Sequence, residues 1–156
     1  MRFLQNAGRW GVILLMACGP AHPAGEPTAP ARMQLAVLPV ESDAFPGVAR
    51  AVNASLQAAK VKGVDETRVS KVSIEVVQLS IECVEPTTAC YEAAGHSMSA
   101  NRLLFARIDP AARQLKLTVT LFDVDARAPQ RTEAKVFATA AAAIQGAPAL
   151  VAAVTQ

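Results

Sequence analysis

The spacing of hydrophobic residues changes several times along the chain, and each change predicts a different element of secondary structure. Residues 34–40 form a nearly continuous apolar run of strand length, which is typical of a strand covered on both faces. In residues 45–60 the larger apolar side chains recur every three or four positions, which predicts an amphipathic helix. Residues 71–82 alternate with a period of two except at Val76 and Val77, which predicts a second strand with a bulge at that slip.

The second half of the chain predicts a loop with a short helix, three strands and a carboxy-terminal helix. In that order, these elements occupy residues 82–95, 102–109, 114–124, 131–138 and 139–156. The clearest strand directs four apolar residues inward and three polar residues outward, namely Leu115, Leu117, Val119 and Leu121 against Lys116, Thr118 and Thr120. Thr87 or Thr88 is expected to cap the short helix and Thr139 the last one, in which Pro148 is expected to begin a second helical piece.

This order of elements predicts an α/β or α+β fold. We expect a single compact domain at residues 33–156, with a mixed sheet of about five strands packed by two to three helices. The short link at residues 109–113 predicts that the strands on either side of it form an antiparallel hairpin.

The amino-terminal segment predicts export and lipid attachment. Two arginines precede an apolar run, residues 10–17, which is shorter than the roughly 20 apolar residues of a permanent membrane span. The run ends in the sequence LMAC at residues 15–18, which resembles the lipobox of bacterial lipoproteins. This resemblance implies that residues 1–17 are removed as a signal peptide and that Cys18 is acylated and holds the protein in a membrane. The alternatives are an ordinary signal peptide with an incidental cysteine and an uncleaved cytosolic amino terminus.

The residues after the lipobox predict a tether. Gly19 stands where an aspartate would resemble an inner-membrane retention signal, so we expect an outer-membrane anchor with the domain facing the periplasm, and surface exposure as the alternative. Residues 18–32 contain four prolines among small and polar residues, which favours an extended segment.

Charge argues against a nucleic-acid partner. Removing the signal peptide would remove Arg2 and Arg9 and no acidic residue, so the 15 basic and 13 acidic residues of the whole chain would become 13 of each. A neutral protein lacks the excess of basic residues that displaces counterions from phosphates.

Cys83 and Cys90 are the most chemically informative pair in the predicted domain. An exported protein meets an oxidising compartment, and a loop with the first turn of a helix separates the two residues, so we expect a structural disulfide. A redox-active pair and, together with His96, a zinc site are the alternatives. Neither has the spacing of a C-x-x-C motif or of a common zinc site.

Other polar residues give no pattern of catalysis. His96 lies beside Ser97 and near Ser99, but neighbours in sequence rarely form a triad, and the chain has no G-x-S-x-G elbow. Asp123 and Asp125 lack the glycine and terminal glutamate of a calcium loop and suit a solvated turn. We therefore expect no enzymatic activity, no metal and no cofactor.

Three stretches carry a family resemblance. LAVLPV at residues 35–40, SANRLLFARI at 99–108 and LTVTLFDVDA at 117–126 look like the compact α/β domain of TolB amino-terminal regions and of periplasmic lipoproteins of the CsgG and LpoB kind. Residues 82–126 are also similar to envelope proteins of myxobacteria. The resemblance implies a domain that binds other proteins or builds an assembly.

Two classes of function follow. The first is a non-enzymatic, outer-membrane-anchored interaction or assembly module that docks an envelope protein. The second is a small-ligand-binding or thiol-redox protein that uses the region of Cys83, Cys90 and His96. Phe122 falls on the polar phase of its strand, so it either packs beneath a helix or belongs to a partner-binding surface.

Overall fold

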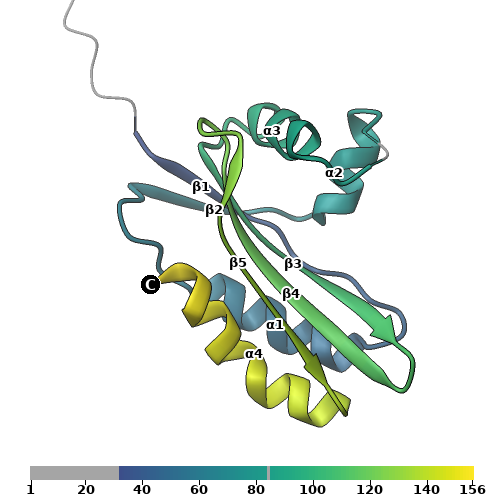
Figure 1. Cartoon of the computed structure of the whole chain (residues 1–156). Coiled ribbons are helices and arrows are strands. Elements are labelled where there is room, and N and C mark those ends of the chain that lie inside the picture. Colours follow the sequence, from purple (N-terminus) through teal and green to yellow (C-terminus); the bar gives the residue numbers. More distant parts are fainter. Residues whose placement is uncertain (1–31, 84) are drawn as a thin grey trace, which may run out of the picture. The chain divides into compact units, whose positions relative to one another are not determined.

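The structure is a computed structural model that describes residues 32–83 and 85–156 (Figure 1). The predicted signal peptide, Cys18 and the predicted tether up to residue 31 lie outside the described residues. The described domain has nine elements, namely β1 (Gln34–Val37), α1 (Pro46–Ala58), β2 (Glu66–Val69), α2 (Ile74–Ser80), α3 (Thr88–Ser97), β3 (Arg102–Ala111), β4 (Gln114–Asp123), β5 (Ala128–Phe137) and α4 (Ala140–Thr155).

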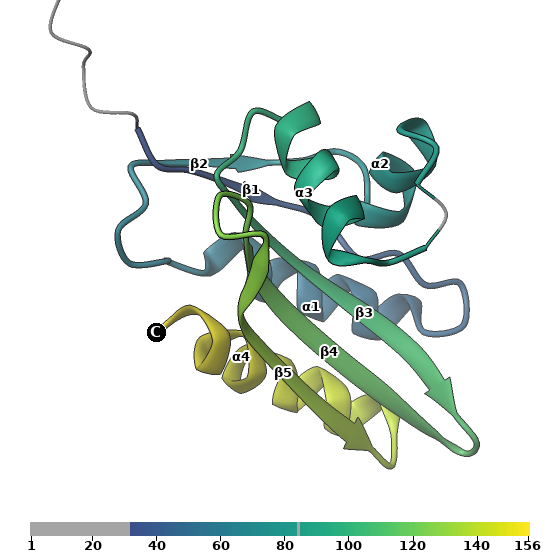
Figure 2. The ribbon, with the colours of Figure 1, turned by 45° about the horizontal axis from the view of Figure 1, so that its top comes forward.

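The five strands form one mixed sheet in the order β2-β1-β3-β4-β5. β1 pairs in parallel with both β2 and β3, whereas β3, β4 and β5 form an antiparallel meander. Two helices cover each face of the sheet, α1 and α4 on one side and α2 and α3 on the other (Figures 1 and 2). The predicted α/β class, the mixed five-stranded sheet and the β3–β4 hairpin are confirmed.

Both faces of the sheet bury apolar side chains, and alternate residues of a strand contribute to different cores. Leu35 and Val37 of β1 join the core beneath α1 and α4, while Ala36 and the following Leu38 join the core beneath α2 and α3. This explains why residues 34–40 read as an apolar run without alternation. The predicted α1 stripe is confirmed, since Val48, Val52 and Leu56 are buried.

The predicted strand at residues 71–82 is wrong, because this segment contains the helix α2. Ile74, Val77 and Ile81 recur at intervals of three and four and pack into the core beneath α2 and α3, which we call the second core. This helical spacing overrides the shorter alternation. The bulge predicted at Val76 and Val77 is therefore wrong as well. The sheet is completed instead by β2, a four-residue strand just upstream. As a result the domain has four helices and not two or three.

Two smaller expectations also change. Pro148 begins no second piece, since α4 is a single helix that contains it. The alternation of β4 predicts that Thr120 points outward, but the residue is 9% exposed and accepts a hydrogen bond from the hydroxyl of Thr132 on β5 at 3.3 Å. The predicted caps are confirmed, because the hydroxyl oxygens of Thr87 and Thr139 accept hydrogen bonds from the backbone amides of Cys90 and Ala142.

Candidate functional site

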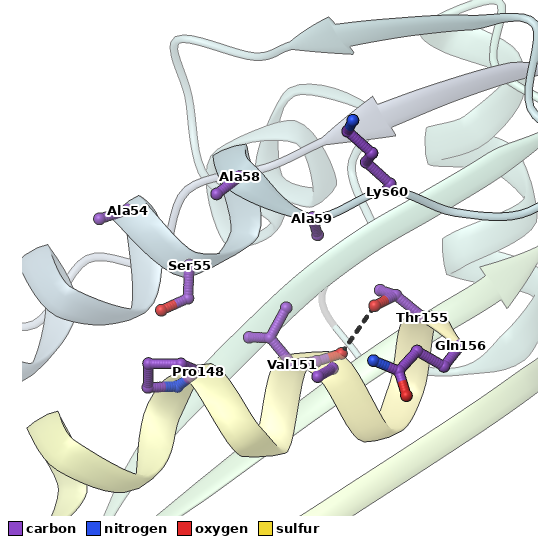
Figure 3. A pocket seen from close by; sticks show the side chains of 10 residues that line it. Ala54, Ser55, Ala58, Ala59, Lys60, Pro148, Val151, Thr155 and Gln156 are labelled. Atoms are coloured by element: carbon purple, nitrogen blue, oxygen red, sulfur yellow. Dashed lines mark hydrogen bonds between the residues drawn. The ribbon is translucent and has the colours of Figure 1, made fainter.

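An open apolar groove of about 640 Å³ runs between the carboxy-terminal halves of α1 and α4 (Figure 3). Its walls are mostly small side chains, which leave space between two helices that pack against each other further along. The lining residues are Ala54, Ser55, Ala58, Ala59, Lys60, Pro148, Val151, Ala152, Thr155 and Gln156. The hydroxyls of Ser55 and Thr155 donate to the carbonyls of Ala51 and Val151, so these two hydroxyls are already bonded to backbone.

A second hollow of about 390 Å³ adjoins the groove and shares Thr155 and Gln156 with it. Lys62, Arg102 and Arg131 make its lining basic. The guanidinium of Arg131 donates to the carbonyl oxygens of Ala153 and Gln156 at 2.9 and 3.0 Å, so β5 is tied to the end of α4. Neither hollow is lined by a histidine, a cysteine, an aspartate or a glutamate.

The predicted cysteine pair lies on the other face of the sheet. A disulfide joins Cys83 to Cys90, with the Cα atoms 5.7 Å apart. Cys83 follows α2 and Cys90 is in the first turn of α3, so the bond links two helices that pack on the same face. Cys90 is completely buried, which keeps its sulfur from solvent.

The structure does not bring His96 to the cysteines. His96 lies six residues beyond Cys90 on α3, about 9 Å along the helix axis, and it faces another side. Its side chain is exposed and lies 3.5 Å from the carboxylate of Glu92, one turn earlier. The three residues therefore form no common site. Across residues 32–83 and 85–156, no group of three metal-ligating side chains comes together.

Phe122 is fully buried beneath α3, so it does not belong to a partner-binding surface. Its ring lies 5.5 Å from that of Tyr91, which also packs 4.9 Å from Phe105. Burial raises the pKa of the Tyr91 hydroxyl, against the opposite effect of Arg107 close by. Phe122 shares a face of β4 with the predicted polar residues Lys116, Thr118 and Thr120. At Phe122 this face is covered by α3, so both faces of the sheet are covered there.

The outer side of α2 carries an apolar row that sequence reasoning missed. Val72, just before the helix, and Val76 and Leu79 within it are 41%, 41% and 70% exposed. The spacing of three residues between Val76 and Leu79 places them on the side of α2 opposite the buried Ile74 and Val77, and Val72 lies in the bend that leads into the helix. These three apolar residues can be picked out in the sequence, but in a strand Val72 and Val76 would lie on one face and Leu79 on the other.

Comparisons with known proteins find similarity to several solved structures. No protein-family model matches the chain, and no curated protein matches its sequence. The chain is similar to the LpoB C-terminal domain from Salmonella enterica, with a TM-score of 0.45 and 12% identity, over 72% of this chain and 87% of that chain. It is also similar to a PelC dodecamer from Paraburkholderia phytofirmans, with a TM-score of 0.35 and 15% identity, over 85% and 92% of the two chains. Similarity at this level carries no argument about function.

Within the described part of the chain, no helix is both long enough and apolar enough to cross a membrane. The surfaces of interest are the α1–α4 groove, the basic hollow beside it and the apolar row on α2.

Proposed function

We propose that this protein is a non-enzymatic lipoprotein of the outer membrane, whose domain faces the periplasm and docks an envelope protein. The observation that carries the docking role is the apolar row of Val72, Val76 and Leu79. Surface apolar residues are ordinary when scattered, but exposed apolar residues grouped on the outer side of a helix and in the bend before it are typical of a recognition surface.

The position of α2 supports this role. The helix is held to the domain by the buried Ile74 and Val77 and, through the disulfide at its end, by α3. A helix fixed in this way presents its outer side with little entropy left to lose on binding, which favours affinity. Glu75 beside the row pairs with Arg107 of β3 at 3.7 Å, so a charged rim lies next to the apolar centre.

The anchor is a separate part of the proposal and rests on the sequence. The lipobox at residues 15–18 supports acylation of Cys18. Metabolic labelling with palmitate tests it: we expect label on the wild-type chain and none on Cys18→Ala, which should also leave the outer-membrane fraction. Equal labelling of the two chains would contradict the anchor.

The docking role is tested by in-cell crosslinking and affinity purification from envelope membranes of the native host. Leu79→Glu places a charge in the centre of the row, and Ile144→Glu makes the same change at a residue 40% exposed on α4, across the sheet. We expect a specific envelope protein to be recovered with the wild type and with Ile144→Glu, but not with Leu79→Glu. Equal recovery with all three chains would refute docking through α2.

A further inference from the structure

β5 is a long edge strand whose outer side pairs with no strand of the described domain. Every residue from 129 to 136 is exposed, so the unpaired backbone groups of this edge are open to solvent. Such an edge is a template for another strand, and proteins restrict its use with charges and prolines. β5 carries charges and a proline, so a strand with complementary charges is favoured as its partner.

The charges on β5 alternate in sign on one face of the sheet. Arg131, Glu133 and Lys135 lie opposite Leu121, Val119 and Leu117 of β4, whose side chains point into the core beneath α4. Thr132, Ala134 and Val136 lie on the other face, and all three are exposed there.

We propose that two copies of this chain pair through their β5 strands, antiparallel about a two-fold axis at Ala134, and form one continuous ten-stranded sheet. In this register Glu133 of each copy lies directly opposite Lys135 of the other, so two cross-strand ion pairs form. On the opposite face Ala134 meets its own symmetry mate, and Val136 lies opposite Thr132 of the second copy. Opposite charges in such positions stabilise a sheet, and like charges destabilise it.

The neighbouring registers are less favourable. An axis at Glu133 would place the two Glu133 carboxylates opposite each other and Arg131 opposite Lys135, so every charged pair would repel. An axis at Thr132 would pair Arg131 with Glu133, but it would draw Pro129, which has no N–H, and the register shift between Leu121 and Phe122 into the interface. Only the axis at Ala134 combines opposite charges with a regular strand.

The flank of α4 next to β5 is compatible with a second copy. None of the 16 residues of α4 is charged, although about half of them are exposed. The side of α4 that meets β5 contains Gly146, which contacts Phe137. It also contains Ala153, whose carbonyl oxygen accepts a hydrogen bond from Arg131. Ala142 and Ala149 share this side by helical spacing. Small side chains there would let the α4 helices of the two copies lie side by side above the joined strands.

Cysteine crosslinking in the oxidising periplasm tests the register. With Ala134→Cys, the two new thiols would face each other across the axis at a strand-pair distance of about 4.5 to 5.5 Å between Cα atoms, which a disulfide can bridge. We expect a covalent dimer on non-reducing gels. Thr132→Cys is the matched control, because its symmetry mates would be about four residues apart along the strands. That single change should give no dimer, whereas Thr132→Cys combined with Val136→Cys should restore it.

Charge reversal tests the chemistry of the pairing. Glu133→Lys alone, or Lys135→Glu alone, would place like charges opposite each other twice in the dimer, and we expect dimerisation to weaken about tenfold in low salt. The double variant Glu133→Lys with Lys135→Glu should regain the wild-type dissociation constant. Sedimentation velocity of the purified full-length lipoprotein in detergent provides the measurement.

Each outcome decides the proposal. A monomer at all concentrations, no crosslink with Ala134→Cys, or an equal crosslink with Thr132→Cys would overturn it. The inference goes beyond the docking role of α2 and uses another surface. Leu79→Glu should therefore leave the dimer intact, and the single charge reversals should still recover the envelope partner.

Discussion

Gly146 of α4 lies directly against the ring of Phe137, the last residue of β5. A Cβ added at Gly146 would lie 2.5 and 2.7 Å from Cε1 and Cζ of that ring, closer than real side chains come. Phe137 is nearly buried in the core beneath α1 and α4, so its ring has little space to yield. The glycine thus permits α4 to pack onto the end of the sheet, which brings the helix beside the edge strand.

We expect Gly146→Ala to destabilise the domain by about 1 to 3 kcal/mol, because overpacking outweighs the gain in helix propensity. Gly47→Ala is the matched control. A Cβ there would meet only Cδ1 of Ile144 at 3.8 Å, an ordinary contact, so this change in α1 should be neutral or slightly stabilising. Denaturant unfolding of both variants provides the measurement, and an equal effect of the two changes would contradict the steric explanation.

The disulfide between Cys83 and Cys90 should contribute to stability and not to chemistry. Replacing both cysteines by alanine should lower the free energy of unfolding by about 2 to 3 kcal/mol, the chain-entropy value for so short a loop, without abolishing the biological role. Reduction of the wild type by dithiothreitol should shift the melting temperature in the same direction. Retained stability with lost activity in the double variant would instead indicate a redox role.

Tyr91 allows a direct test of packing beneath α3, since it is the single tyrosine of the chain. Burial raises its pKa above the ordinary value of about 10. Stabilisation by the neutral hydroxyl is therefore complete below pH 10 and is lost as the pH rises through the higher pKa of the folded state. Tyrosinate absorbance should show a higher titration midpoint in the folded protein than in denaturant.

Arg107 opposes this shift, so Arg107→Met should move the folded-state midpoint of Tyr91 further up. A folded-state midpoint equal to that of the denatured chain would show that the tyrosine is solvated.

Substitutions at Phe122 and Leu79 should distinguish residues that stabilise the domain from residues that dock a partner. Phe122→Ala would leave a cavity in the second core and should cost about 3 to 5 kcal/mol. Leu79→Ala removes a side chain that is 70% exposed, so it should change stability by less than about 0.5 kcal/mol while it weakens recovery of the envelope partner. Thermal unfolding of the two variants in parallel checks the first half of this contrast, and a large loss of stability in Leu79→Ala would indicate that the row is part of the core.

Elements with a single strong period were predictable from the sequence. The alternation of β4, the stripe of α1 and the threonine caps of α3 and α4 depend on neighbours in the chain, and these neighbours are present in any conformation of it. The apolar run at residues 34–40 likewise indicated a strand with two covered faces, which the structure confirms.

The segment of α2 shows where local pattern stops being sufficient. Residues 72–81 contain apolar side chains that fit both a strand and a helix, and the choice depends on which of them finds a core to enter. In the folded domain Ile74 and Val77 enter the core beneath α2 and α3, and the row of Val72, Val76 and Leu79 stays outside.

The sequence by itself determined the class of fold, five of the strand and helix assignments in the second half of the chain, and the expectation of an exported, lipid-anchored domain. Only the tertiary structure decided that Phe122 is buried, that His96 lies apart from the disulfide, and that β5 is an open edge beside an uncharged helix. The physical reason is that burial and proximity depend on segments distant in sequence. Local periodicity specifies which face of an element is apolar, but not which surface that face will meet.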